Sequence, residues 1–510
     1  MPSQKMKKWL SIPWYPFFLA AYPIAALLSF NLGQAKYVAG IRPTILSLVI
    51  ALVLLFLLRI FYRDWHRAAF AAGALVFLFF LYGHVYDLIS AKWKNPDLMI
   101  WMLAIWFALI VFAFVLAGLH KLHFQSAALT LNVISLGLML YPIVQIVQFS
   151  IANSSPPTKS SPAPIADLRI PQDQALPDVY YIMPEDYGRV DYLQQSFHID
   201  VSSFMQFLTN NGFYVAGCSQ SNYAMSELSL GSALNMDYLQ NLGPAFSPKS
   251  VDQGPIWDAI RYSAVSGALK QVGYKTVAFA TGFAWSELDN SDVYISPSPL
   301  LSGMTNFEDL LLRTTPARHL EDFGILNLDQ IDGERYRERT MLEFNSMSRL
   351  AHMPGPKFVF VHIISPHEPF VFDANGTPID PATFLNRDRL YTFNEYVRGY
   401  QGQVPFVDQM LEKSITTLIR ESSRPLVIIL QTDTGPLFTN GSDQFKILNA
   451  YYMPGHTDQL YSSISPVNTF RVIFNAYLGT DYPLLKDISY DSPIPHIYDY
   501  SEVSNPCSDH

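Results

Sequence analysis

Apolar residues are concentrated in the first 150 positions of the chain, where they form five long runs. Each run is close to the ~20 residues that a helix needs to cross the hydrocarbon core of a bilayer. The first run follows a basic start, but no small-residue cleavage site comes after it, so we expect it to be retained rather than removed as a signal peptide. The pattern therefore predicts a bundle of about five transmembrane helices, at residues 14–33, 43–62, 68–90, 98–118 and 126–149.

Positive charge is unevenly distributed around these runs. If the N-terminus lies in the cytoplasm, the inner flanks hold more Lys and Arg than the outer loops, which is the usual bias of membrane proteins. Five spans that begin inside must end outside. We therefore expect a multi-pass protein of the plasma (inner) membrane whose remaining chain is extracytoplasmic. One span more or fewer would invert this orientation.

A segment rich in proline and serine, at residues 151–177, separates the apolar part from the rest of the chain. It shows no apolar period, and its composition favours a partly extended tether over a packed element. We therefore divide the chain into a transmembrane helical domain at 1–150, a linker at 151–177 and a soluble domain at 178–510.

After the linker, short apolar runs alternate with helical patterns. The runs are rich in β-branched and aromatic residues, as in buried strands. Alternating strands and helices indicate βαβ units, and hence an α/β domain with a largely parallel sheet covered by helices on both faces. We expect strands at 179–183, 213–217, 275–280, 357–364, 425–431 and 446–453, and helices at 200–211, 227–235, 255–272, 394–421 and 467–479.

Charge and cysteine content narrow the class of protein. The net charge is −9 and the Lys and Arg residues are scattered, so no basic stripe suggests a nucleic-acid partner. The two cysteines, Cys218 and Cys507, lie in the soluble part, and no CxxC pattern points to a cysteine-built zinc site. In an extracytoplasmic domain the two could form a disulfide, which we favour over two separate thiols.

Polar residues come directly after several predicted strands. In α/β sheets, ligands bind beyond the carboxyl ends of the strands, so these residues are the first place to look for chemistry. The candidates are the segments Pro-Glu-Asp at 184–186, Ser-Pro-His-Glu at 365–368, Thr-Asp-Thr-Gly at 432–435 and the polar stretch 219–235.

Taken in order, these segments resemble the sulfatase-like branch of the alkaline phosphatase superfamily, which includes lipoteichoic acid synthases and phosphoethanolamine transferases. The resemblance covers roughly residues 177–485. It rests on the motifs PDVYYIMPEDYGR, GFYVAGCSQSNYAMSELSLGSALNMDYL, KFVFVHIISPHEPFVFDANG, VIILQTDTGP and ILNAYYMPG…ISPVNTFRVIFNAYLG.

The resemblance implies an alkaline phosphatase-like fold with a mixed, mostly parallel sheet. It also implies one divalent metal ion, Mn, Zn or Mg, which binds a phosphate or sulfate ester. The same ion lowers the pKa of a Ser or Thr hydroxyl that attacks phosphorus or sulfur.

Three residues take family roles by their positions in these motifs. Glu185 matches the first carboxylate ligand, with Asp186 as a competing candidate and a plain loop acid as the alternative. Ser226 matches the nucleophile and is a ligand in this scheme. It would lie at a helix N-terminus that favours anions, although an ordinary N-cap serine fits the same pattern. Asp433 matches the aspartate of the family's Asp-His-Gly motif.

The residue after Asp433 departs from the family. Thr434 stands where a histidine ligand is expected, and a neutral hydroxyl is a much poorer ligand for a transition metal. A site of Glu185, Ser226, Asp433 and Thr434 would suit magnesium or calcium better, because these ions accept oxygen ligands and water. His456 could in principle supply the missing imidazole, but its spacing does not demand it.

Other residues are candidates for the substrate pocket. His367 matches a histidine that faces the bound phosphate or the leaving group. His362 lies inside a predicted strand, where we favour a buried core histidine over substrate contact. We expect Asn222 and Tyr223 to shape the pocket beside Ser226, and the segment 282–292 could be a loop that faces substrate.

Two functions from different classes follow. The first is a membrane-anchored extracytoplasmic hydrolase or transferase that acts on phosphate or sulfate esters of lipid, lipid-linked or cell-envelope glycan substrates. The alternative is a pseudoenzyme with a degenerate metal site that serves as an envelope binding or scaffolding protein. A transport function is disfavoured because the apolar runs contain few charges. The sequence identifies neither the substrate head group nor the oligomeric state.

Overall fold

The computed structural model divides the chain into two compact units. The membrane unit comprises Met1–Pro156 together with Gly303–Leu328, and the α/β unit comprises Pro157–Ser302 together with Asp329–His510. Residues 155–167 and 169–174 of the predicted linker lie outside the described residues. The structure describes residues 12–32, 37–93, 95–119, 124–154, 168, 175–297, 305–320, 322–325, 328–380, 392–436, 441–505 and 507.

Each of the five apolar runs forms a helix of the membrane unit. Within the described part of the chain, four of them are long and apolar enough to cross a membrane, while α2 has only 16 residues. A fully spanning α2 therefore stays a prediction. The helices are α2 (Tyr15–Phe30), α3 (Ile41–Tyr62), α4 (Trp65–Ser90), α5 (Leu98–Gly118) and α6 (Phe124–Ser154).

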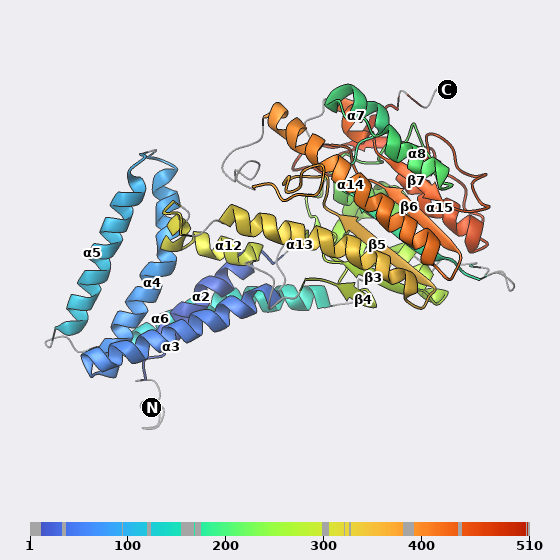
Figure 1. Cartoon of the computed structure of the whole chain (residues 1–510). Coiled ribbons are helices and arrows are strands. Elements are labelled where there is room, and N and C mark those ends of the chain that lie inside the picture. Colours follow the sequence, from blue (N-terminus) through green and yellow to red (C-terminus); the bar gives the residue numbers. More distant parts are fainter. Residues whose placement is uncertain are drawn as a thin grey trace. The chain divides into compact units, whose positions relative to one another are not determined.

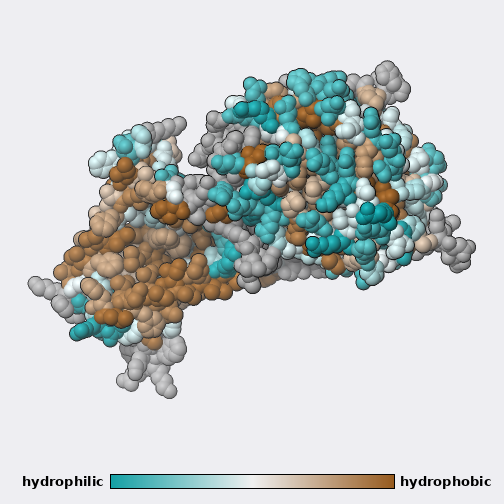
Figure 2. Space-filling model, in the orientation of Figure 1, coloured by the Kyte–Doolittle hydropathy of each residue, from teal (hydrophilic) through white to brown (hydrophobic). Residues whose placement is uncertain are grey.

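The outer surface of these helices is apolar, as Figure 2 shows in brown over the N-terminal helices. Ile60 and Phe61 at the end of α3 are each 74% exposed, and Phe107 on α5 is 69% exposed. Large apolar side chains gathered on an exposed surface are costly in water and are expected where a helix faces lipid. This surface agrees with the predicted transmembrane bundle.

A short stretch of the second half of the chain packs with the N-terminal helices. It carries α12 (Asn306–Arg313) and the 3-10 helix η4 (Pro316–Leu320). Arg318 forms an ion pair with Asp87 of α4 at 2.8 Å, and His319 Nε2 shares a 2.9 Å hydrogen bond with the Tyr82 hydroxyl. The apolar pattern does not predict this grouping, because the stretch contains no long apolar run.

The α/β unit is built on a mixed sheet. In the described residues this sheet has seven strands in the order β2-β7-β6-β1-β5-β3-β4. All neighbouring pairs from β6 to β4 are parallel, whereas β7 runs antiparallel to both β6 and β2. The predicted mixed, mostly parallel sheet is confirmed. Its strands are β1 (Asp178–Pro184), β2 (Tyr214–Val215), β3 (Lys275–Phe279), β4 (Val293–Ile295), β5 (Lys357–Ile363), β6 (Leu426–Gln431) and β7 (Asn449–Tyr452).

Helices cover both faces of this sheet, as Figure 1 shows. Because side chains alternate along a strand, Tyr181 and Met183 of β1 pack into one apolar core while Tyr180 and Ile182 pack into the other. The first core contacts α9 (Ser226–Asn235), α10 (Gly254–Arg261), α11 (Ala264–Gln271) and α15 (Pro466–Tyr477). The second contacts α7 (Val190–Phe197), α8 (Ser202–Asn210), α13 (Leu328–Arg349) and α14 (Phe393–Glu421).

Local details differ from the predicted pattern at a few points. The helical pattern at 255–272 is two helices, because Ser263 leaves the helical conformation and caps α11 through a 3.4 Å bond from the Ser266 amide. Helix α14 continues through Pro405. Strand β4 and the hairpin of β8 (Ser489–Asp491) and β9 (Ser501–Val503) were not predicted, since strands of three residues carry almost no periodicity.

Cys218 and Cys507 form a disulfide, which confirms their expected pairing. Their Cα atoms are 5.4 Å apart, within the usual range for such bonds. The Asn505 amide adds a 2.9 Å hydrogen bond to the Cys218 carbonyl. Together these contacts tie the C-terminal segment to the loop that precedes α9.

Candidate metal and active site

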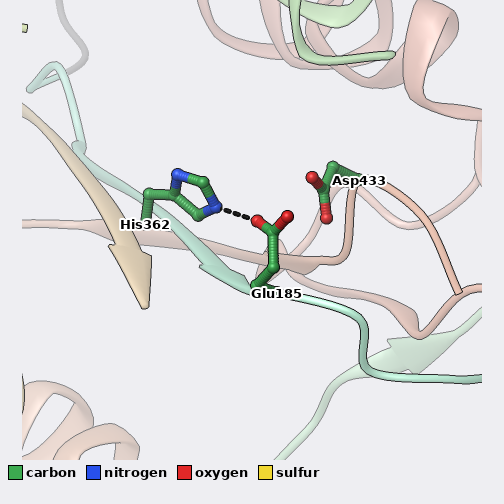
Figure 3. A group of neighbouring side chains, drawn as sticks. All are labelled: Glu185, His362 and Asp433. Carbon is green, nitrogen blue, oxygen red and sulfur yellow. Dashed lines mark hydrogen bonds and ion pairs between the residues drawn. The ribbon is translucent and has the colours of Figure 1, made fainter. Parts of the chain in front are cut away.

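Three neighbouring parallel strands deliver polar residues to one edge of the sheet. The register pairs Met183 of β1 with His362 of β5, and Ile182 of β1 with Leu430 of β6. Glu185 and Asp433 follow β1 and β6 by one or two residues, so they reach the same edge as His362. One ligand atom from each of Glu185, His362 and Asp433 lies within 4.8 Å of the others, as Figure 3 shows. We call these three residues the inner triad.

Glu185 is the centre of the inner triad. The Ser226 hydroxyl donates a 2.9 Å hydrogen bond to one of its oxygens, and His362 Nε2 donates to the other. The three side chains are buried, with residue exposures of 5% for Glu185, 0% for His362 and 2% for Asp433. Neither carboxylate oxygen of Asp433 has a hydrogen-bond partner among the described residues.

The two carboxylates of the inner triad differ in their pKa shifts. Burial and the charges of Glu185 and Asp186 raise the pKa of Asp433 well above its usual value. Burial would also raise the pKa of Glu185, but His362, His367 and the Ser226 hydroxyl together lower it below its ordinary value. The pKa values of the two carboxylates are therefore shifted in opposite directions.

The donor set fits a divalent metal ion. A buried carboxylate without partners is costly unless a cation compensates it. Two carboxylates and one imidazole are ligands for ions such as zinc or manganese. The unpartnered oxygens of Asp433, close to the other two donor atoms, are the observation that supports this fit.

Ser226 begins helix α9, and Met225 takes the N-cap position without a side-chain capping bond. The alternative of a plain N-cap serine is wrong, because its hydroxyl bonds to Glu185 rather than to the helix backbone. The predicted position at a helix N-terminus is confirmed. The residue is half-buried.

A second group of two carboxylates and an imidazole lies at the same edge. Asp186, His367 and Glu368 have ligand atoms within 4.8 Å of one another, and we call them the outer triad. Asp186 has a left-handed backbone with φ of 59°, which is uncommon for a residue other than glycine and recurs at functional sites. The Thr434 hydroxyl donates to Asp186 at 3.3 Å, so it is engaged with the outer triad.

His367 is the cation of the outer triad. Burial would lower its pKa, but Asp186, Glu368 and Glu185 raise the pKa of His367 to about 9. Its Nε2 lies 3.9 Å from Asp186 Oδ2, and its Nδ1 donates to the Glu368 carbonyl. At neutral pH the ring is therefore an imidazolium that can give up a proton.

The segment 282–292, predicted as a loop that could face substrate, carries two aromatic rings to the triads. The Trp285 ring centre is 5.2 Å from that of His362, and the Phe283 ring centre is 6.3 Å from that of His367. These rings border both histidines. A role of the segment in substrate contact stays a prediction.

Asn222 and Tyr223 lie in the loop that leads to Ser226, but they are fully buried. Asn222 accepts a 2.8 Å bond from the Val467 amide and donates a 3.0 Å bond to Ser465 Oγ. The Tyr223 hydroxyl donates to Gln240 at 2.8 Å. These bonds shape the loop under Ser226, and the predicted substrate contact of the two side chains stays a prediction.

Sequence reasoning placed His362 in the core, and it is indeed fully buried, but it also belongs to the inner triad. The available signal was a single imidazole near the end of an otherwise apolar strand. His456 lies outside both triads, with its ring 4.7 Å from that of Tyr477.

Comparison with known proteins supports the sulfatase-like resemblance. The Sulfatase family profile matches residues 177–465, which is more than half of the chain. No curated protein sequence matches the chain significantly.

Several solved structures are similar at low sequence identity. The C-terminal periplasmic domain of EcEptC from Escherichia coli is 12% identical, with a TM-score of 0.41 and coverage of 64% of this chain and 92% of that one. Lipooligosaccharide phosphoethanolamine transferase A from Neisseria meningitidis, an integral membrane protein, is 13% identical, with a TM-score of 0.39 and coverage of 93% and 95%. The periplasmic domain of EptC from Campylobacter jejuni is 13% identical, with a TM-score of 0.37 and coverage of 60% and 89%.

These TM-scores and identities are too low to transfer an activity. The profile match carries the assignment, and the strand order with its polar edge agrees with it. The chain belongs to the Sulfatase family.

Proposed function

We propose that this protein is a membrane-anchored, extracytoplasmic enzyme that hydrolyses or transfers phosphate or sulfate esters of lipids, lipid-linked intermediates or cell-envelope glycans. The observation that carries the proposal is the Ser226 hydroxyl at the start of α9, bonded to Glu185 at the edge of the inner triad. A nucleophile, an anion-binding helix end and a group of metal-ligand types meet there.

Ser226 is the proposed nucleophile. Its hydroxyl loses its proton to solvent, Oγ attacks the phosphorus or sulfur atom of the ester, and a covalent bond forms between Oγ and that atom as the bond to the leaving oxygen breaks. The 2.9 Å hydrogen bond to Glu185 orients the hydroxyl. The free N–H groups and the dipole of the α9 N-terminus favour the negative oxygens of the substrate.

A divalent ion held by Glu185 and Asp433 fits the proposal. When bound, it neutralises ester charge and lowers the pKa of the serine hydroxyl. Whether this ion is Mn, Zn or Mg is decided by the rest of the ligand set.

His367 is the proposed acid. Its raised pKa keeps it protonated at neutral pH, so it can donate a proton to the leaving oxygen. In the second half of the reaction, water or an acceptor hydroxyl attacks the Ser226 ester and gives a proton back to His367. Attack by water gives hydrolysis, and attack by an acceptor hydroxyl gives group transfer.

The location follows from the membrane unit and the disulfide. Helices that suit a bilayer imply a substrate at or near the membrane surface. The Cys218–Cys507 bond suits an oxidising compartment, which supports an extracytoplasmic α/β unit.

The test is an ester-cleavage assay on the full-length protein in detergent, with bis(p-nitrophenyl) phosphate, p-nitrophenyl phosphate and p-nitrophenyl sulfate as substrates. We expect metal-dependent release of nitrophenol that Ser226→Ala abolishes, and a mass increase on the Ser226 peptide when the reaction is quenched early. If all three esters were untouched, or if Ser226→Ala kept its activity, the proposed mechanism would be wrong.

One observation favours the alternative of a binding protein without catalysis. Thr434 replaces the family's histidine, and within the inner triad His362 and Glu185 already satisfy each other through a hydrogen bond. In that case the pocket would bind an anionic envelope polymer but turn nothing over. Ester binding that competes with inorganic phosphate, without any product, would support the alternative.

A further inference from the structure

The residue after Asp433 supplies no imidazole. It is Thr434, whose side chain offers only a hydroxyl, and that hydroxyl donates a hydrogen bond to Asp186 at 3.3 Å. We infer that His362, on the neighbouring strand β5, supplies the imidazole ligand of a divalent metal site completed by Glu185 and Asp433. This inference rests on the proposed function and specifies which side chains hold the ion.

The pairing of the strands allows His362 to take the place of a histidine after Asp433. Strand β1 lies between β5 and β6, and both neighbours run parallel to it. Because parallel strands bring their carboxyl ends to the same edge, a ligand on β5 is as close to Glu185 as a ligand after β6. His362 Nε2 is in fact in hydrogen-bond contact with Glu185, as Figure 3 shows.

The charges favour a divalent cation over a simple ion pair. A core histidine that only bonds to Glu185 would leave Asp433 buried at 2% exposure with both oxygens unpartnered among the described residues. Such a carboxylate is costly to bury. An ion of charge +2 offsets the two carboxylates and accepts the lone pair of a neutral imidazole, so all three side chains are satisfied together.

The ligand chemistry predicts which metal is bound. A site with oxygen ligands alone suits magnesium or calcium. An imidazole shifts the preference towards zinc and manganese, and three protein ligands leave a coordination position open for substrate beside Ser226.

The experiment uses full-length protein in detergent. Pulsed EPR of the Mn²⁺-loaded protein reports directly whether an imidazole nitrogen binds the ion, and chelator competition gives the affinities for Zn²⁺ and Mg²⁺. The variants are His362→Gln, which keeps a hydrogen-bonding group of similar length, and the matched control His352→Gln, whose side chain is 69% exposed. Asp433→Asn reports on the site as a whole.

We expect a nitrogen signal in the wild type and in His352→Gln that His362→Gln removes. Zn²⁺ affinity of His362→Gln should fall at least about 100-fold, because the loss of outer partners alone often costs about 10- to 100-fold. Mg²⁺ affinity should change by no more than about threefold, because magnesium takes oxygen ligands.

Three other results would contradict the inference. A wild-type spectrum without a nitrogen signal overturns it even if no variant folds. A nitrogen signal that persists in His362→Gln overturns it too, and metal binding that Asp433→Asn still abolishes would then leave the proposed function intact. If no ion binds in an Asp433-dependent way, the inference and the metal-dependent mechanism both fall.

Discussion

The inner and outer triads contain the same side-chain types but differ in how their charges are balanced. In the inner triad, His362 pairs with Glu185 while Asp433 keeps two unpartnered oxygens among the described residues. In the outer triad, the single cation His367 lies near two carboxylates and is held protonated. The inner triad therefore leaves one carboxylate with little compensation, whereas the outer triad contains a protonated imidazole.

This difference teaches that composition alone does not identify a metal site. In our proposal, two carboxylates and an imidazole would bind an ion in the inner triad, and the charged imidazole would donate a proton in the outer triad. Burial sharpens the distinction, because the inner residues are almost fully covered whereas the His367 side chain is 20% exposed. Exposure leaves His367 free to exchange protons with a substrate.

The largest expected effect is a difference in Zn²⁺ affinity between a variant of the inner triad and a variant of the outer triad. Asp433→Asn should lower the affinity for Zn²⁺ at least about 100-fold, since a direct ligand is lost. Asp186→Asn, a matched change in the outer triad, should lower it clearly less, because Asp186 does not belong to the inner triad. Calorimetric titration of both variants measures this, and equal losses would mean that the triads form one site.

Asp433→Asn, which should weaken metal binding, should stabilise the fold of the metal-free protein. With a chelator present, Asp433→Asn should raise the free energy of unfolding at pH 7, because it removes the buried charge while keeping a side chain of the same size. The raised pKa of Asp433 gives the sign, because a buried carboxylate that resists ionisation destabilises the folded state above its unfolded pKa. Denaturant unfolding followed by fluorescence would show it. A less stable variant would mean that Asp433 has a partner in the metal-free protein.

The outer triad should also lose stability as the pH rises, but through the loss of a favourable charge on His367 rather than the gain of an uncompensated charge on Asp433. The folded pKa of His367 is raised to about 9, so its stabilisation is complete below about 6.5 and is lost as the pH rises through about 9. In chelator, His367→Gln should cost about 1–2 kcal/mol at pH 6 and almost nothing at pH 10. Unfolding curves across this range test it, with His352→Gln as the control. A cost that does not change with pH would rule out the imidazolium.

The smallest effect concerns the position where the family places histidine. Thr434→Ala removes one 3.3 Å hydrogen bond to Asp186. If Thr434 is not a ligand, Zn²⁺ affinity should change by no more than about threefold, well below the loss expected for a direct ligand. The same titration applies, and a loss near that of Asp433→Asn would make Thr434 a ligand after all.

Much of the fold follows from the sequence. The apolar runs of the membrane helices and of β1, β5 and β6 are continuous, so their length and composition identify them. Glu185 and Asp433 lie in polar segments that directly follow such strands, and the family resemblance singled them out together with Ser226. The Cys218–Cys507 pairing followed from the expected compartment.

Other features depend on tertiary information. His362 joins Glu185 only through the pairing of β1 with β5, and no local pattern encodes that register. The packing of α12 and η4 against the N-terminal helices rests on scattered contacts such as Arg318 with Asp87. The separate roles of Asp186 and Thr434 are set by side-chain direction, which neighbouring sequence positions do not determine.

The most direct test of the account is the anomalous scattering of zinc in crystals of the full-length protein grown with Zn²⁺. We predict a peak bonded to Glu185, His362 and Asp433 at about 2.0–2.2 Å, the usual range for nitrogen and carboxylate ligands, with Ser226 beside it. A peak on Asp186, His367 and Glu368 instead, or no peak at the inner triad, would contradict the account.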